Sequence, residues 1–142
     1  MKHAIEVNIV DSKNDLHKVF DIRRTVFVEE QKVDEREEYD EFEDTSKHLI
    51  AICDGEAVGA ARVRRTANGV KLERFAVLNS SRGKGVGEAL VLKSLEMTKE
   101  YSNIYLHAQI QVVDFYKKFG FQTEGDEFLE AGIRHYKMTL KP

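Results

Sequence analysis

The feature that most constrains this chain is the segment LNSSRGKGVGEALV, residues 78–91, in which three glycines stand within five residues. A strand-like segment precedes it, and an apolar pattern of helical spacing follows. Glycine loses more conformational entropy on folding than any other residue. A loop with three glycines therefore indicates a ligand or a chain conformation that requires a backbone without side chains. The first turn of a helix offers unpaired backbone amides that attract anions. We therefore expect phosphate binding by Gly83, Gly85 and Gly87, with added charge from Arg82 and Lys84.

The common nucleotide motifs do not fit this loop. A P-loop requires G-x-x-x-x-G-K-[ST], which no glycine of the segment satisfies. A dinucleotide fingerprint requires G-x-G-x-x-G, but counting from Gly83 the last position falls on Glu88. The alternative to a phosphate site is a tight connection from strand to helix with solvated basic residues.

Length and composition indicate one soluble globular domain over residues 1–142, with 42% hydrophobic and 33% charged residues. The net charge of −3 argues against a nucleic-acid surface. No apolar run is long enough to cross a bilayer and no signal peptide is evident, so we expect no membrane partner and a cytoplasmic protein. Cys53 is interpreted as a buried thiol. The scattered histidines and the single cysteine predict no metal site.

Alternating and helical patterns predict a mixed order of elements, with hairpin turns at Asp54-Gly55 and Asn68-Gly69. We expect strands near residues 3–10, 48–53, 56–65, 70–78, 103–110, 121–125 and 132–140. We expect helices near residues 12–27, 86–101 and 112–119. This order indicates an α/β or α+β sheet with helices on both faces.

Two motifs resemble the GNAT acyltransferase superfamily. The first is Arg82-x-x-Gly85-x-Gly87 after LERFAVL, and the second is AQIQVVDFYKKFGFQTEG, residues 108–125. The segments RRTVFVEEQKVDEREEYDEFEDTSKHL and EFLEAGIRHYKM resemble the ElaA/YjcF-type branch of small bacterial GNAT proteins. The resemblance implies a single GNAT-like domain with a mixed, mostly antiparallel central sheet. It also implies an N-acetyltransferase in which an amine attacks acetyl-CoA directly, with no metal.

The resemblance also assigns roles in donor binding and proton donation. Phe75, Ala76 and Val77 contact the pantetheine arm, and residues 82–87, Val86 included, hold the pyrophosphate. Tyr116 matches the proton donor of the family; the alternative is an aromatic side chain packed in the core. Gln109 stands near the position where the family often has an asparagine, and we group it with the cofactor contacts.

Glu73 is the first candidate for the general base. Strand alternation predicts that Glu73, Phe75 and Val77 share one face, beside the donor. The alternative is an ion pair of Glu73 with Arg62, Arg64 or Arg74. His107 and His135 are further candidates for the base.

Eight of the eleven residues from Asp34 to Asp44 are acidic. Carboxylates that line a cleft attract a cationic amine, whereas the alternative is a solvated, mobile loop. The candidate contacts to the acceptor are Phe27, Glu30, Gln31, Glu38, Asp40 and His135.

The sequence therefore predicts an acetyl-CoA-dependent enzyme that acetylates a small amine or a peptide, as a monomer or a homodimer. Two alternatives stay open: a sensor of acyl-CoA that catalyses nothing, and a transferase with a longer acyl donor.

Overall fold

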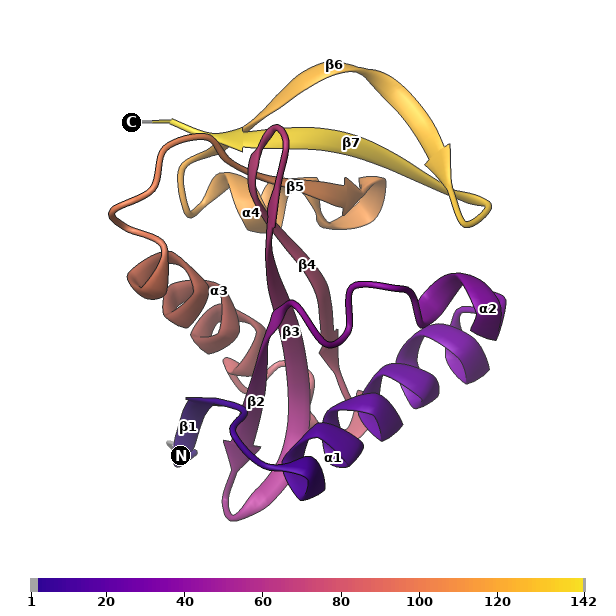
Figure 1. Ribbon diagram of the computed structural model, residues 1–142, viewed down its shortest axis with the longest axis vertical. Coiled ribbons are helices and arrows are strands. Elements are labelled where there is room, and N and C mark those ends of the chain that lie inside the picture. The colour runs from indigo at the N-terminus through magenta and orange to yellow at the C-terminus, as the bar shows by residue number, and fades with distance from the viewer. Residues whose placement is uncertain (1–2, 142) are drawn as a thin grey trace.

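The computed structural model describes residues 3–141, which form a seven-stranded sheet in the order β1-β2-β3-β4-β5-β7-β6 (Figure 1). All neighbouring strands are antiparallel except β4 and β5. The mixed, mostly antiparallel sheet that the sequence predicts is confirmed. The strands are β1 (Ile5–Ile9), β2 (Lys47–Cys53), β3 (Glu56–Thr66), β4 (Gly69–Val77), β5 (Ile104–Gln109), β6 (Phe121–Glu130) and β7 (Ile133–Leu140).

Helices cover both faces of the sheet, and Figure 1 shows α1 and α3 on opposite sides of β2–β4. Ala60 of β3 packs in the core under α1, whereas the next residue, Ala61, packs under α3. None of the helices in residues 3–141 is long and apolar enough to cross a membrane. The helical segments are α1 (Lys13–Arg23), the π-helix η1 (Arg24–Glu30), α2 (Glu35–Glu38), the 3₁₀ turn η2 (Asn79–Ser81), α3 (Val86–Met97), the 3₁₀ turn η3 (Ile110–Val112) and α4 (Val113–Lys117).

The parallel strands β4 and β5 stay paired over only part of their length. Val70, Lys71 and Leu72 pair with residues 104–106, and the pairing ends there. The rest of β4, from Glu73 to Val77, has no strand beside it on the β5 side. The two strands therefore separate toward their carboxyl ends, where an opening forms in the sheet.

Candidate functional site

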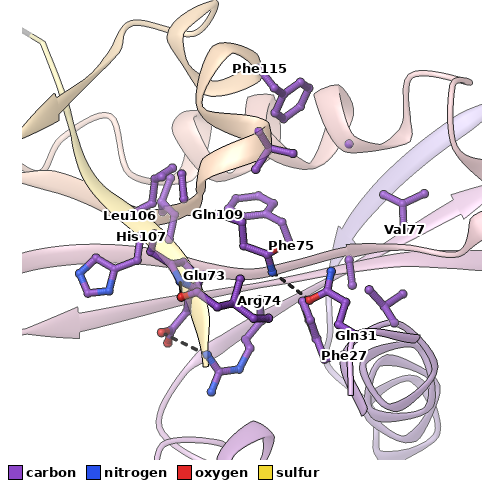
Figure 2. A pocket seen from close by; sticks show the side chains of 18 of the residues that line it. Phe27, Gln31, Glu73, Arg74, Phe75, Val77, Leu106, His107, Gln109 and Phe115 are labelled. Carbon is purple, nitrogen blue, oxygen red and sulfur yellow. Dashed lines mark hydrogen bonds and ion pairs between the residues drawn. The ribbon is translucent and has the colours of Figure 1, made fainter. Parts of the chain in front are cut away.

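A cavity of about 950 Å³ lies where β4 and β5 separate (Figure 2). Its walls come from η1, β4, the glycine loop, β5, α4 and the hairpin between β6 and β7. Of the site residues that the sequence predicts, Lys84 does not line the cavity. The others do: Phe27, Glu30, Gln31, Glu38, Asp40, Glu73, Phe75, Ala76, Val77, Arg82, Gly83, Gly85, Val86, Gly87, Gln109, Tyr116 and His135.

β4 carries a β-bulge between Glu73 and Ala76, where it has one residue more than β3. Arg74, inside the bulge, has a φ of 58°, in the left-handed region. The extra residue reverses the alternation of side chains. Glu73 lies on the α1 face of the sheet, whereas Phe75 and Val77 pack on the α3 face. The prediction that these three side chains share one face is therefore wrong.

The glycine loop keeps its backbone amides free. Gly83 and Gly85 have φ values of 79° and 91°, which side chains adopt only with strain. Within residues 3–141, none of the amides from 83 to 88 donates to a protein acceptor; the amide of Ala89 is the first to do so, to the Gly85 carbonyl at 3.0 Å. These free amides lie at the amino end of α3, where the helix dipole is positive. The loop therefore has the chemistry of an anion site.

Arg82 is fixed at the edge of this loop. Its Nη1 and Nη2 donate to the two carboxylate oxygens of Glu30 at 2.6 and 3.0 Å, and its Nε donates to the Val77 carbonyl at 3.0 Å. The guanidinium group holds the pKa of Glu30 below its usual value. Glu30, which the sequence assigns to the acceptor, thus contacts the predicted phosphate-binding arginine instead.

Tyr116 of α4 is buried among aromatic rings. Its ring centroid lies 5.8 Å from that of Phe75, 5.1 Å from that of Phe115 and 6.2 Å from that of Phe121. Burial raises the pKa of the hydroxyl, so Tyr116 stays protonated at neutral pH. Among residues 3–141 the hydroxyl has no hydrogen-bond partner, although the residue lines the cavity. Packing and access to the cavity are thus both properties of this side chain.

Two glutamines bridge the cavity between η1 and β5 (Figure 2). Gln109 Nε2 donates to Gln31 Oε1 at 2.8 Å, and Gln109 Oε1 accepts from Gln111 at 2.7 Å. Phe27 of the π-helix lines the same cavity. Gln109 and Gln31, which the sequence assigns to different ligands, are therefore partners of each other.

Glu73 is the centre of an ion-pair group. Its carboxylate lies 2.6 Å from Arg62 Nη2, 2.9 Å from Arg64 Nε and 3.4 Å from Lys71 Nζ. Although burial alone raises the pKa of Glu73, these cations lower it to about 2. A carboxylate with this pKa is a weak proton acceptor. The ion pair, which the sequence left open as the alternative, is the arrangement found.

The acidic segment is divided: Asp34, Glu35, Glu37, Glu41 and Asp44 are exposed, whereas Glu38, Asp40 and Glu43 are paired with arginines. Glu38 is buried and accepts from Arg23 Nε at 2.7 Å. Asp40 accepts from Arg62 at 2.7 and 2.8 Å, and these bonds contribute to a pKa of about 2. Glu43 contacts both arginines. Because buried arginines already neutralise these carboxylates, the expectation that Glu38 and Asp40 attract an amine by charge loses its basis.

Glu130, at the end of β6, is a cavity residue that the sequence analysis missed. Its Oε1 lies 2.9 Å from His107 Nδ1, and its Oε2 lies 3.8 Å from His135 Nε2. His135 Nδ1 lies 2.7 Å from the Ile133 carbonyl, so that nitrogen carries a proton. The bond to His107 and the nearby cations lower the pKa of Glu130 against the effect of burial. A glutamate at a hairpin end gives no sequence signal that separates it from a surface residue.

Possible metal ligands meet at another place. His3, Cys53 and Asp54 offer ligand atoms within 4.8 Å of one another. Asp54 already accepts from His3 and from the Ala4 amide, both at 3.0 Å. None of the three lines the cavity.

Comparison with known proteins gives consistent results. The family model of the acetyltransferase (GNAT) domain matches residues 11–142. The chain is 43% identical to the uncharacterized N-acetyltransferase YjcF of Bacillus subtilis over 135 residues. The matched region covers 92% of this chain and 95% of YjcF. The crystal structure of Escherichia coli ElaA has a TM-score of 0.86 at 27% identity and covers 97% of this chain and 100% of ElaA. That of a Bacillus subtilis acetyltransferase in complex with CoA has a TM-score of 0.73 at 20% identity, covering 98% and 99% of the two chains.

Proposed function

The chain belongs to the GNAT acetyltransferase family, and from this premise we propose that it transfers the acetyl group of acetyl-CoA to an amine by direct attack. The observation that carries the proposal is the run of free amides at residues 83–88 beside Arg82, at the open end of the separated strands. A fold relative crystallised with CoA supports the same donor.

The donor fits the residues present. The amides of the glycine loop and Arg82 hold the pyrophosphate, which replaces the Glu30 carboxylate on the guanidinium group. The open edge of β4 around Phe75, Ala76 and Val77 receives the pantetheine arm, whose amides pair with strand backbone groups. Lys84 is outside this assignment because it does not line the cavity.

In the proposed reaction the neutral amine attacks the thioester carbonyl carbon, the C–S bond breaks, and the sulfur leaves as a thiolate. Tyr116 donates its hydroxyl proton to that thiolate, a role that suits a buried and protonated tyrosine without another partner. The cavity holds both substrates in one place, which supplies part of the rate.

His107 takes the amine proton in this proposal, in place of Glu73. Its Nδ1–H donates to Glu130 at 2.9 Å, which leaves Nε2 unprotonated and able to accept a proton. Glu130 orients the ring and stabilises the imidazolium that forms. Glu73 instead holds the cations around it, since its pKa of about 2 makes it a weak base.

The test is calorimetric titration with acetyl-CoA, followed by an amine screen. We expect micromolar binding by the natural protein, at least tenfold weaker binding by Arg82→Ala, and unchanged binding by the matched control Lys84→Ala. Dissociation constants above about 1 mM for the folded natural protein would overturn the donor assignment.

The transfer step is tested with Tyr116→Phe. We expect kcat to fall by about 10²–10⁴-fold with donor affinity unchanged. Tight acetyl-CoA binding without transfer to any amine identifies the non-catalytic sensor instead. Turnover with decanoyl-CoA but not with acetyl-CoA identifies a transferase of longer acyl groups.

A further inference from the structure

Two cations face each other at the closed end of the cavity. Arg64 of β3 and Lys71 of β4 are register partners on the α1 face of the sheet, and both line the cavity. Like charges directly opposite on paired strands destabilise a sheet. Such a pair needs an anion that neutralises both members.

Arg64 has a free guanidinium edge. Its Nε donates to Glu73 at 2.9 Å, and its guanidinium carbon stands 4.0 Å from the centroid of the Phe42 ring. Within residues 3–141, no acceptor contacts Nη1 or Nη2, although the side chain is only 16% exposed. The stacked ring holds the planar group in one orientation, so these two nitrogens form a prepared fork for a carboxylate.

Lys71 is similarly short of partners. Its Nζ lies 3.4 Å from Glu73 Oε1, which is its single ion pair in the described chain, and its side chain is 12% exposed. Glu73 also serves Arg62 and Arg64. Glu130 attracts Lys71 electrostatically without a direct ion pair, and its hydrogen bond is made with His107. Since Arg62 also has Asp40 and Glu43 as partners, the imbalance lies at Arg64 and Lys71, two cations that share Glu73 as their one ion-pair partner in the described chain.

The position along β4 suits a substrate contact. Lys71 lies where β4 and β5 still pair, whereas Phe75, beside Tyr116, lies four residues farther along β4. Because the bulge takes up one of these residues, the separation along the sheet is about 10 Å at the rise of a strand. Arg82 stands beyond Phe75, at the opposite end of the cavity. A ligand between Tyr116 and the two cations thus has room for an amine at one end and an anion at the other.

Resting on the proposed function, we propose that the amine acceptor carries a carboxylate a few bonds from its amine, as a free amino acid does. The carboxylate is bound by the Nη1 and Nη2 groups of Arg64 and by the ammonium group of Lys71. A lysine side chain within a protein lacks this carboxylate and is not an acceptor.

The experiment compares the twenty L-amino acids with their carboxamides, which differ by one charge. With saturating acetyl-CoA, we expect kcat/KM to be at least tenfold higher for the best amino acid than for its carboxamide. Arg64→Gln removes this preference by raising the KM for the amino acid, and Lys71→Gln reduces the preference. Arg65→Gln is the matched control because Arg65 stacks on Tyr101 outside the cavity, and it keeps the preference.

Ligand-observed NMR of the same compounds gives a second measurement that needs no donor. We expect a saturation-transfer signal for amino acids with the natural protein. The signal is absent with Arg64→Gln and is retained with Arg65→Gln. Equal binding and turnover of the two compound sets, or equal losses for both sets in Arg64→Gln, would overturn the carboxylate site. Failure of acetyl-CoA to bind in calorimetry contradicts the proposed donor instead, so the two failures are distinguishable.

Discussion

The two ends of the cavity are built from different parts of the polypeptide. At the glycine-loop end, backbone amides and one half-exposed arginine form the wall, and the residues involved are close in sequence. At the other end the wall is made of charged side chains, among them Glu38 and Glu73, which pair with the almost completely buried Arg23 and Arg62 behind the wall. The first end depends on local backbone conformation, whereas the second depends on a network that only the whole fold assembles.

The difference has an energetic consequence. Each buried arginine contacts at least two carboxylates, so removing one leaves several buried charges without a partner. At the glycine loop, the ion pair of Arg82 with Glu30 is exposed to solvent, which screens it. We therefore expect stability to depend on one end of the cavity and donor affinity on the other.

The largest expected effect compares the same substitution at the two ends. Arg62→Met leaves Asp40, Glu43 and Glu73 without their shared cation, and we expect the free energy of unfolding to fall by about 3–5 kcal/mol. Arg82→Met loses an exposed pair, which costs about 0–1 kcal/mol. Urea unfolding of both variants at pH 7 measures the difference. Equal losses in the two variants would contradict the division between the ends.

Lowering the pH is a second way to test how far stability depends on the buried charges at one end of the cavity. The pKa of Glu73 is about 2 in the folded protein and 4.5 ordinarily, so its ionic stabilisation is complete above pH 4.5 and is lost as the pH falls toward 2. The difference corresponds to about 3 kcal/mol, and Asp40, whose pKa is also about 2, adds to it. Urea unfolding from pH 7 to pH 2.5 measures this decline.

Glu73→Gln provides the control for the acid experiment. The variant is less stable at pH 7 because four cationic side chains lose the one carboxylate that contacts all of them. Its stability depends less on pH than that of the natural protein, by the contribution of one titrating group. The same decline in both proteins would show that Glu73 is not the group responsible.

The same division explains how much of the site the sequence predicts. The element order follows from local patterns, whereas the assignment of most of the residues that gather at the cavity follows from the family resemblance. The bulge at Arg74 does not follow from local patterns, because a bulge is a property of the register between two strands. Strand alternation without it placed Glu73 on the wrong face.

The ion pairs of the acidic segment were also beyond the sequence, although that of Glu73 with arginines was an open alternative. Eight acidic residues in eleven are typical of a solvated loop, yet Glu38 pairs with Arg23 of α1, and Asp40 pairs with Arg62 of β3. The partners are 15 and 22 residues away in the chain, and only packing of the segment against the sheet selects them. The local pattern of charges does not identify partners that are so distant in the sequence.

The smallest expected effect tests the contact that joins the donor end to η1. Bound pyrophosphate replaces the Glu30 carboxylate on Arg82, so Glu30→Gln removes a competitor worth about 0.2–1 kcal/mol. We expect the dissociation constant for acetyl-CoA to fall by up to about fivefold. Calorimetry at low salt measures it, with Glu29→Gln as the control because Glu29 is exposed and does not line the cavity. Weaker binding by Glu30→Gln alone would mean instead that Glu30 orients the guanidinium group for the phosphates, and that the donor end also relies on a side-chain pair.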